Sequence, residues 1–294
     1  MANILDGKQA AKDIKAELEI EIQKLGENGI VPGLVAVLVG NNPASEIYVS
    51  SKAKQCKKIG IYSEVIRRED TVTHDELLDL IRELNQRRDV HGILVQEPLP
   101  KQIDILNLKL NIDSRKDVDG FHPTNLGRIL IGQPMFLTCT PYGILELLRR
   151  NNIPLYKKDV VILGRSNIVG KPLAAMMFQK WPDTNGTVTI CHTGTADIPK
   201  HTRQADVVVC AMGIAEYLKG DMIKDGAVVV DVGINRVDDP SQKKGYRVVG
   251  DVDYESCFDK CSWITPVPGG VGPMTIAMLL YNTVKACKII NNLE

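Results

Sequence analysis

Short strand-like runs that alternate with helical segments constrain the fold of this chain more than any other feature. Runs at residues 34–39, 62–67 and 92–96 are separated by two segments of helical periodicity. The first, at about 44–59, is expected to end at Gly60, and the second, at about 73–86, is expected to begin with a capping box formed by Thr73 and Glu76. Strands that are joined by helices in this way form parallel sheets, and the helices cover the faces of those sheets. The pattern therefore predicts an α/β protein with mostly parallel sheets.

The spacing of the runs changes near residues 140–155, where a second series of strands begins. A chain of 294 residues, 44% of them hydrophobic, is long enough for two cores of ordinary size. We therefore predict an N-terminal α/β domain over residues 1–142, completed by a C-terminal helix over 275–294, and a second α/β domain over 143–274.

The remaining elements are expected at the following places. The second series of strands is predicted at 159–163, 187–191, 206–210 and 228–232. Further helices are predicted at about 7–25 with Gly26 and Gly29 as stops, and at 104–110, 123–131, 141–150 and 274–288. The polar stretch Asp238–Gly245 is interpreted as a turn between two strands.

The stretch VVILGRSNIVGKP, Val160–Pro172, combines an apolar run with a glycine-containing loop. The phosphate loop of a nucleoside-triphosphatase needs four residues between its glycines and a Ser or Thr after its lysine. Here five residues separate Gly164 from Gly170, and Pro172 stands in place of the metal-binding hydroxyl. A strand followed by a helix that begins near Gly170 would instead hold a dinucleotide pyrophosphate at the helix N-terminus. An ordinary strand–helix turn is the alternative, since the spacing departs from G-x-G-x-x-G.

The end of the next predicted strand bears on which dinucleotide is bound. NAD-binding folds usually carry an Asp or Glu there, which binds the ribose 2′-hydroxyl. This strand is followed by His192 and Thr193, and Asp197 comes several residues later. Arg165 and Ser166 in the glycine loop could meet a 2′-phosphate with a guanidinium and a hydroxyl. We therefore predict NADP as the cofactor, and the alternative is that Arg165 is a solvated loop residue.

Tyr48 and Lys52 are four residues apart on a predicted helix, so both side chains project from one face. A lysine that is removed from water can lose its proton near neutral pH and then exchange protons with a substrate. The Y-x-x-x-K pattern also occurs in short-chain dehydrogenases, but there it follows the glycine loop, whereas here it precedes it. An exposed tyrosine and lysine without chemical function are the alternative.

Three other stretches place polar groups or glycines where a ligand could lie. Gln96 stands at the carboxyl end of a predicted strand, the end at which ligands collect in α/β sheets. The segment Lys116–Pro123, KDVDGFHP, has two carboxylates beside a glycine, and a turn capped by Asp side chains is its alternative. The segment Thr265–Thr275, TPVPGGVGPMT, suits a backbone pressed against a ligand, or a tight linker.

Composition excludes several classes of partner. The net charge is zero, from 36 basic and 36 acidic residues, which gives no indication of nucleic acid or of an anionic membrane. No apolar stretch approaches the roughly eighteen residues of a membrane span, and the N-terminus lacks a targeting pattern. Seven scattered cysteines are typical of reduced thiols in a cytoplasmic protein. We expect no metal, because Cys257 and Cys261 lack a second ligand pair and the histidines lack ligand spacing.

Taken in order, these motifs resemble those of the bifunctional methylenetetrahydrofolate dehydrogenase/cyclohydrolase family. The resemblance covers nearly the whole chain, and the glycine loop and the final proline–glycine motif are its most characteristic parts. The matching segments are Tyr48–Lys52, Val95–Pro100, Lys116–Gly120, Thr140–Gly143, Gly164–Pro172, Asp231–Asn235, Gly250–Val252 and Pro268–Pro273.

The resemblance implies an N-terminal catalytic domain and a C-terminal Rossmann-like NADP-binding domain. It implies NADP-dependent oxidation of 5,10-methylenetetrahydrofolate and hydrolysis of the methenyl product to 10-formyltetrahydrofolate, with tetrahydrofolate derivatives as ligands and a homodimer as assembly. Lys52 would exchange protons in the hydrolysis, Tyr48 would position the pterin, Gln96 would bind the lysine, and Asp119 would bind the pterin amino groups. Further substrate contacts would come from Val95, Pro98, Leu99, Pro268, Gly269, Gly270 and Gly272. Cofactor contacts would come from Thr140, Gly164, Arg165, Ser166, Ile168, Val169, Thr193 and Ile234.

Two positions depart from the family pattern. The turn after the glutamine is usually Leu-Pro-Leu-Pro, whereas this chain has Glu97, a carboxylate near the lysine. The second strand of the nucleotide domain often ends in a serine or a basic residue, whereas Thr193 and Gly194 stand here. The alternatives are therefore a dehydrogenase that has lost efficient hydrolysis, a non-catalytic NADP-binding module, or a two-domain reductase of the shikimate type.

Overall fold

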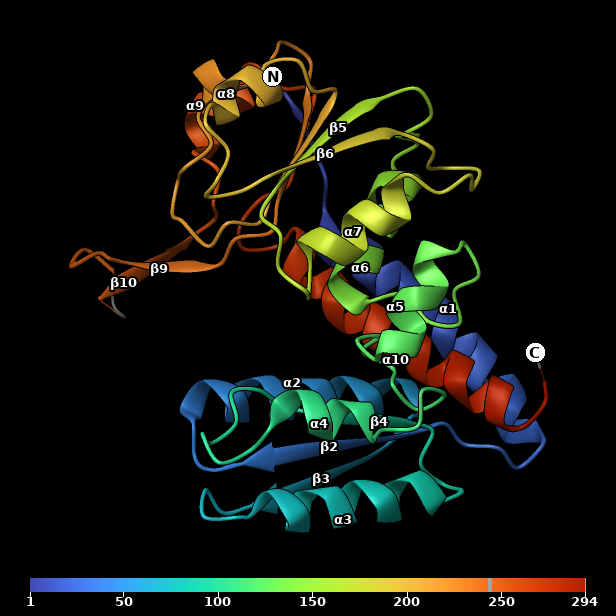
Figure 1. Cartoon of the computed structure of the whole chain (residues 1–294). Helices are drawn as coiled ribbons and strands as arrows, with labels where there is room; N and C mark the ends of the chain where they lie inside the picture. Colours follow the sequence, from blue (N-terminus) through green and yellow to red (C-terminus); the bar gives the residue numbers. More distant parts are fainter. Residues whose placement is uncertain (243–244, 294) are drawn as a thin grey trace. The chain divides into compact units, whose positions relative to one another are not determined.

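A computed structural model describes residues 1–242 and 245–293, and the chain divides into two compact units (Figure 1). One unit comprises Lys12–Cys139 and Ile276–Glu294 and is called the three-stranded unit after its sheet. The other comprises Met1–Ala11 and Thr140–Thr275 and is called the six-stranded unit. The predicted α/β class with mostly parallel sheets is confirmed in both.

The three-stranded unit is built on a parallel sheet in the order β3-β2-β4, formed by β3 (Tyr62–Arg68), β2 (Gly33–Val39) and β4 (Gly92–Val95). Every residue of the central strand β2 is buried, as expected of a strand covered on both faces. Its helices are α2 (Pro43–Ile59), α3 (His74–Gln86), α4 (Ile105–Leu110) and α5 (Pro123–Leu130), together with most of α1 (Gly7–Glu27) and α10 (Val271–Ile290).

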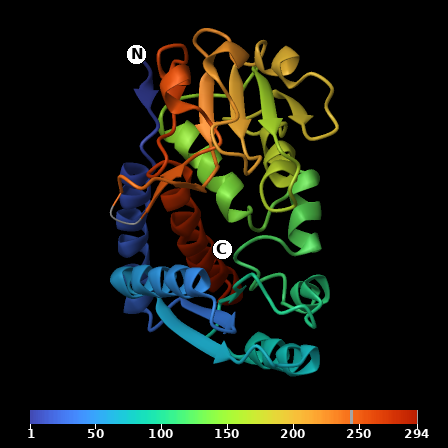
Figure 2. The ribbon, with the colours of Figure 1, turned by 90° about the vertical axis from the view of Figure 1, so that its left-hand side faces the viewer.

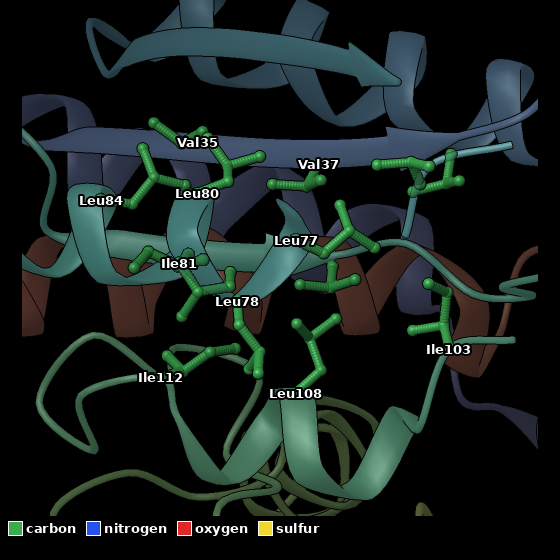
Figure 3. Packing of buried hydrophobic residues seen from close by; sticks show 14 of the residues in the cluster. Val35, Val37, Leu77, Leu78, Leu80, Ile81, Leu84, Ile103, Leu108 and Ile112 are labelled. Carbon is green, nitrogen blue, oxygen red and sulfur yellow. The ribbon is translucent and has the colours of Figure 1, made fainter. Parts of the chain in front are cut away.

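Alternate residues of β2 pack against one face of α3. Val35 and Val37 project from the strand toward Leu77 and Leu84 of the helix, and Leu108 of α4 closes the same cluster (Figure 3). Side chains two apart on a strand and three or four apart on a helix share a face, so the two periodicities match in this core. The core therefore fixes the carboxyl ends of β2 and β4 and the position of α4.

The helix ends in this unit follow local signals in the sequence. Thr73 and Glu76 form the predicted capping box at the start of α3, where each side chain bonds the backbone N–H of the other residue. Helix α2 ends at Gly60, which adopts a left-handed backbone with φ of 89°. Helix α1 does not stop at Gly26 as predicted but continues to Glu27, because a single glycine weakens a helix by only about 1 kcal/mol.

The six-stranded unit has a parallel sheet in the order β1-β11-β8-β7-β5-β6 (Figure 2). Chain order reverses direction at β5, since β6 lies on one side of it and β7 on the other, and ligands bind at such a switch point in open α/β sheets. The strands are β1 (Asn3–Ile4), β11 (Trp263–Ile264), β8 (Val228–Asp231), β7 (Val207–Cys210), β5 (Asp159–Leu163) and β6 (Thr187–Cys191). The helices are α6 (Cys139–Arg150), α7 (Gly170–Met177), α8 (Ile198–Thr202), α9 (Tyr254–Phe258) and the 3₁₀ turn Gly220–Met222.

An antiparallel pair, β9 (Asn235–Asp238) with β10 (Tyr246–Val249), extends from the same unit (Figure 1). It flanks the predicted turn Asp238–Gly245, of which Lys243 and Lys244 lie outside the described residues. Glu294, the end of the predicted C-terminal helix segment, also lies outside them.

The extreme N-terminus differs from the predicted division of the chain. Residues 1–11 group with the six-stranded unit, because Asn3 pairs with Trp263 and Ile4 with Ile264 in a parallel ladder. A two-residue strand is too short to show a period in the sequence, so this pairing could not be predicted locally.

Candidate functional site

Lys52 and Gln96 are hydrogen-bonded in the three-stranded unit. Asn42 caps α2 by accepting hydrogen bonds from the backbone of Ala44 and Ser45, which fixes the start of the helix that carries Tyr48 and Lys52. The Lys52 ammonium donates to Oε1 of Gln96 over 3.1 Å. The predicted contact between these two residues is thus present.

Gln96 is held in one orientation by its own surroundings. Its backbone N–H donates to the carbonyl of Val37 over 2.9 Å, which continues the pairing of β4 with β2 by one residue. Its side-chain Nε2 donates to the carbonyl of Glu97 over 2.7 Å, so Oε1 is the atom turned to Lys52. A neutral amide therefore holds the lysine in place without the strong preference for its charged form that a carboxylate would impose.

The two carboxylates of the KDVDG segment have different roles. Asp117 is buried, and its Oδ2 accepts hydrogen bonds from the backbone of His122 over 2.7 Å and from Asn125 over 2.8 Å. It is thus the turn-capping residue that the alternative interpretation proposed. Asp119 does not take part in this capping, and burial raises the pKa of its carboxyl group while the nearby charge of Lys52 opposes the rise. Asp119 therefore lies within electrostatic range of Lys52.

The Glu97 carboxylate pairs with Lys109 and not with Lys52. It forms an ion pair with the ammonium group of Lys109 on α4. In the sequence, a carboxylate at Glu97 suggested a disturbed Lys52 and therefore a dehydrogenase without efficient hydrolysis. The ion pair with Lys109 gives the Glu97 carboxylate a different partner.

The other predicted substrate residues of this unit differ in their exposure to solvent. Tyr48 is exposed one helical turn before Lys52, and Pro98 is exposed in the loop after β4. The side chains of Val95 and Leu99 instead pack with the hydrophobic core. Val95 is buried, so its main chain is the part that can face a ligand, whereas Leu99 is half-buried and keeps part of its side chain exposed.

In the six-stranded unit, the predicted glycine loop joins β5, which lies between β7 and the edge strand β6, to α7. Gly164 has a φ of 115°, a conformation that favours glycine, and a Cβ there would overlap the carbonyl oxygen of Ala211. A Cβ on Gly170 would overlap the carbonyl oxygen of Gly164. Helix α7 begins at Gly170, and Val169 before it forms no side-chain cap. A close backbone turn that ends in an uncapped helix N-terminus fits the pyrophosphate of a dinucleotide.

The residues near the expected 2′-phosphate are exposed and polar. Arg165 is exposed, and it forms no ion pair among residues 1–242 and 245–293. Ser166 accepts a hydrogen bond from the backbone of Val169 over 3.1 Å, and Thr193 is exposed after β6. Asp197, the nearest carboxylate in sequence, caps α8 by accepting a hydrogen bond from the backbone N–H of Lys200 over 3.1 Å. No acidic side chain thus stands in the first turn after β6 (His192–Thr195).

The proline–glycine motif encloses a cavity of about 170 Å³ within the six-stranded unit. It is lined by the whole segment 266–273, which holds the predicted substrate residues Pro268, Gly269, Gly270 and Gly272, and by the predicted cofactor residue Ile234. Residues predicted for two ligands therefore share one cavity. Of the other predicted cofactor residues, Thr140 is hydrogen-bonded through Oγ1 to Oγ1 of Thr275 over 2.9 Å, Ile168 is exposed and Val169 is buried.

Lys8 lines the same cavity and was not predicted. Its backbone N–H donates to the carbonyl of Gly269 over 3.0 Å, and a Cβ on Gly7 would overlap the carbonyl oxygen of Gly270. The N-terminal segment is therefore part of this cavity wall. The signal was a Gly-Lys pair at the start of a helix, which alone does not indicate a binding site.

Two buried aspartates shape the loops after β7 and β8. Asp231 accepts hydrogen bonds from the backbone of Gly233, Asp251 and Val252, and burial raises its pKa to about 6. Asp251 accepts from the backbone of Met212 over 2.6 Å and of Gly213 over 2.8 Å. The carboxylates of the DVGIN and GDV motifs thus hold loop backbone in place at the carboxyl end of the sheet.

All seven cysteines are buried free thiols, Cys257 and Cys261 among them. Across residues 1–242 and 245–293, no group of three or more His, Cys, Asp or Glu side chains could hold a metal ion. None of the helices in this described part is both long enough and apolar enough to cross a membrane.

The glycine turn after β5, the strand at which the order of the parallel sheet reverses, and the group of Lys52, Gln96 and Asp119 define a dinucleotide-binding α/β enzyme. Two family models match the chain, "Tetrahydrofolate dehydrogenase/cyclohydrolase, catalytic domain" over residues 5–119 and "Tetrahydrofolate dehydrogenase/cyclohydrolase, NAD(P)-binding domain" over residues 138–291. The chain belongs to the tetrahydrofolate dehydrogenase/cyclohydrolase family.

Several relatives match this chain over nearly their full length. The "Bifunctional protein FolD" of Chlorobium limicola is 56% identical over 99% of both chains. The crystal structure of the bifunctional FolD methylenetetrahydrofolate dehydrogenase/cyclohydrolase of Campylobacter jejuni is 49% identical, with a TM-score of 0.93 over 98% of this chain and 99% of that one. The Trypanosoma brucei FolD, solved with NADP cofactor and an inhibitor, is 37% identical with a TM-score of 0.91 over 98% of each chain.

Proposed function

We propose that this chain is a bifunctional one-carbon enzyme whose hydrolytic step depends on Lys52. It oxidises 5,10-methylenetetrahydrofolate with NADP and then hydrolyses 5,10-methenyltetrahydrofolate to 10-formyltetrahydrofolate. The observation that supports this assignment of residues is the hydrogen bond of Lys52 to an oriented Gln96, with Asp119 in electrostatic range. These are a proton carrier, a residue that positions it and a carboxylate for substrate binding.

Each unit has a separate task in this proposal. The three-stranded unit binds the folate, and the predicted division assigns this task to residues 1–142 with 275–294. The six-stranded unit binds NADP, and the predicted division assigns this task to residues 143–274. Parallel sheets suit both tasks, because side chains and loops at the carboxyl ends of their strands converge on a ligand.

Asp119 is the main polar contact of the pterin in this proposal. A carboxylate accepts hydrogen bonds only, and the pterin amino group and ring N–H supply donors to it. Tyr48 stands exposed one turn from Lys52 and packs its ring against the substrate. The main chain after β4 borders the folate, and the predicted folate contacts Pro268–Gly272 line the cavity of the six-stranded unit.

NADP fits the six-stranded unit at the glycine loop. Gly164 and Gly170 keep the backbone free of side chains, and the uncapped start of α7 offers N–H groups to the pyrophosphate. Arg165, Ser166 and Thr193 hold the 2′-phosphate, and Ile234 borders the nicotinamide end. When bound, NADP accepts the hydride that leaves the methylene carbon of the folate. The cation that remains on the folate is shared by two nitrogens, so the protein supplies placement and no side-chain base for this step.

Hydrolysis needs a proton carrier because the attacking water must lose a proton. Water adds to the methenyl carbon, and the neutral amine of Lys52 accepts one of its protons. The bond from this carbon to N5 then breaks as N5 takes a proton from the Lys52 ammonium. The hydroxyl group on the carbon releases its remaining proton to solvent as its C=O bond forms, and the carbon stays on N10 as a formyl group. Gln96 keeps the Lys52 Nζ in place through both transfers.

A dual absorbance assay tests this function and the cofactor preference. With 5,10-methylenetetrahydrofolate and NADP we expect NADPH to form and methenyl-folate to appear and then decay. The Michaelis constant for NAD should exceed that for NADP by at least about tenfold, the effect of losing one or two charge-assisted bonds to a phosphate. Equal Michaelis constants for NAD and NADP would contradict the assignment of Arg165. If methenyl-folate decays no faster with the enzyme than without it, the enzyme has the dehydrogenase activity only.

We further propose a homodimer that forms through β3. This strand lies at the edge of its sheet with β2 as its one neighbour among the described strands, and Tyr62 on it is exposed. An edge strand of seven residues offers unpaired backbone groups to a second copy. Light scattering after gel filtration should give about twice 32.4 kDa, and Val65→Pro should shift the mass toward the monomer. A wild-type monomer at micromolar concentration would rule this out.

A cytoplasmic location completes the proposal. All seven cysteines are free thiols, as is usual in a reducing compartment.

A further inference from the structure

Lys109 contacts both loops that carry the proposed active-site residues of the three-stranded unit. Its ammonium pairs with the carboxylate of Glu97, the residue that follows Gln96. The same ammonium lies 5.2 Å from the ring centroid of Phe121, which follows Asp119 by two residues. One side chain on α4 thus joins the loop after β4 to the loop that bears Asp119.

The backbone beneath Lys109 is fixed. Leu108 beside it is 1% exposed and belongs to the core cluster with α3 and β2 (Figure 3). Asn107 of the same helix is hydrogen-bonded to His74 over 3.0 Å. Because α4 is anchored to the core in this way, the Lys109 side chain extends from a rigid support to the two loops.

Glu97 in turn supports Gln96. The Glu97 carbonyl accepts one hydrogen bond from Nε2 of Gln96 over 2.7 Å and a second from Oγ of Ser45 over 3.4 Å. An ion pair that holds the Glu97 side chain therefore restrains the carbonyl that orients Gln96, and Gln96 holds Lys52.

We propose that Glu97 and Lys109 form a strap, closed on Phe121, that positions Gln96 and Asp119 relative to each other and so supports the hydrolytic step. Both members of the strap are positioning residues, since they act through Gln96 and Asp119. The inference rests on the proposed roles of Lys52, Gln96 and Asp119. It also explains why this chain departs from the family pattern at Glu97. A charged residue stands there in place of an apolar one because it pairs with Lys109 on α4.

The strap also has an electrostatic consequence that a purely structural contact would lack. The charged or titratable groups that act on Asp119 are Lys52 from α2, Asp117 from its own loop, Cys139 at the start of α6 and Lys109 from α4. Lys109 lowers the pKa of Asp119, and Glu97 partly neutralises Lys109. Loss of Lys109 should therefore move the acid limb of the pH profile of folate turnover to higher pH. Loss of the Glu97 charge should leave that limb in place or move it to lower pH.

A double-mutant cycle with Glu97→Gln, Lys109→Gln and the pair of changes tests the strap in the full-length enzyme. Each single change should reduce kcat/KM of the cyclohydrolase by roughly three- to tenfold, the range of a partly exposed ion pair with a cation–π contact. The double variant should be no worse than the poorer single variant. The Michaelis constant for NADP should stay unchanged, and Lys101→Gln, an exposed lysine in the same connection, should behave as wild type.

Strictly additive losses, or an unchanged kcat/KM in Lys109→Gln, would overturn the strap. So would acid limbs that move in the same direction by the same amount in both single variants. Lys52→Met in the same series separates the two proposals. If that variant hydrolyses methenyl-folate normally, the proposed function of Lys52 fails; if it is inactive while the strap variants are unchanged, the strap alone fails.

Discussion

Lys52→Met should abolish the cyclohydrolase activity and leave folate binding in place. Proton transfer by a positioned side chain contributes about 10²–10⁴ to a rate, and methionine has a similar length but carries no proton. We therefore expect methenyl-folate hydrolysis to fall by at least about a hundredfold. The dehydrogenase should retain turnover within roughly tenfold of wild type, because that step uses placement of the methylene carbon and no side-chain base.

The measurement is the decay of methenyl-folate absorbance in the variant, beside NADPH formation in the same preparation. A matched control is Lys54→Met, which makes the same change to an exposed lysine on the same helix but on another face. The control should hydrolyse at the wild-type rate. Normal hydrolysis in Lys52→Met would remove this lysine from the mechanism, and equal losses in both activities would point to a folding defect or to a lost substrate contact.

A substitution of Gln96, the hydrogen-bond partner of Lys52, distinguishes the effect of holding Lys52 in position from the effect of a charge beside it. Gln96→Glu would place a carboxylate 3.1 Å from the ammonium in place of the amide oxygen, by the geometry of the present hydrogen bond. Such a neighbour favours the charged lysine, which cannot accept a proton from water. The neutrality of Gln96 is thus part of the proposed mechanism and distinguishes it from a simple anchoring role.

Local signals in the sequence identified much of the fold. Thr73 and Glu76 predicted the start of α3 because capping depends on residues three apart, and Gly60 predicted the end of α2. The loop Gly164–Gly170 predicted the strand–helix turn of the nucleotide site for the same reason. These features depend on short stretches of chain, so a single sequence can display them.

Contacts between distant segments could not be predicted from the residues alone. The edge strand β1 and the packing of Lys8 on Gly269 join the first residues of the chain to segments near its end. Gly250 illustrates the same limit, because its lack of a side chain is explained only by Asp231, whose Oδ2 occupies the space where a Cβ would lie. Neither residue indicates the other by spacing or by chemistry.

The pair Asp117 and Asp119 shows what the structure adds at the site itself. In the sequence the two carboxylates are equivalent, since each could cap a turn or bind a ligand. Asp117 accepts hydrogen bonds from His122 and Asn125, whereas burial raises the pKa of Asp119 and the charge of Lys52 opposes that rise. The resemblance assigns the ligand to Asp119, and the hydrogen bonds show that Asp117 is used in capping the turn.

Asp119→Ala is expected to weaken folate binding above all. Hydrogen bonds to a charged group contribute about 1.5–3 kcal/mol each, and the pterin would lose such bonds with no replacement. The dissociation constant for a folate analogue should therefore rise by roughly ten- to several-hundredfold. Binding of NADP should be unchanged, since the glycine loop lies in the other unit. Glu83→Ala, an exposed carboxylate on α3, serves as control.

The pH dependence of binding gives Asp119 a signature of its own. Burial raises its pKa, so the carboxyl group takes up a proton at a higher pH than an exposed aspartate would. The protonated form loses the charge that receives the pterin donors, and folate affinity in the wild type should fall as pH decreases through this range. Asp119→Asn has no such titration, so its weaker affinity should stay level over the same range. Calorimetric titrations at several pH values make the comparison, and an identical pH dependence in wild type and Asp119→Asn would assign the titration to another group.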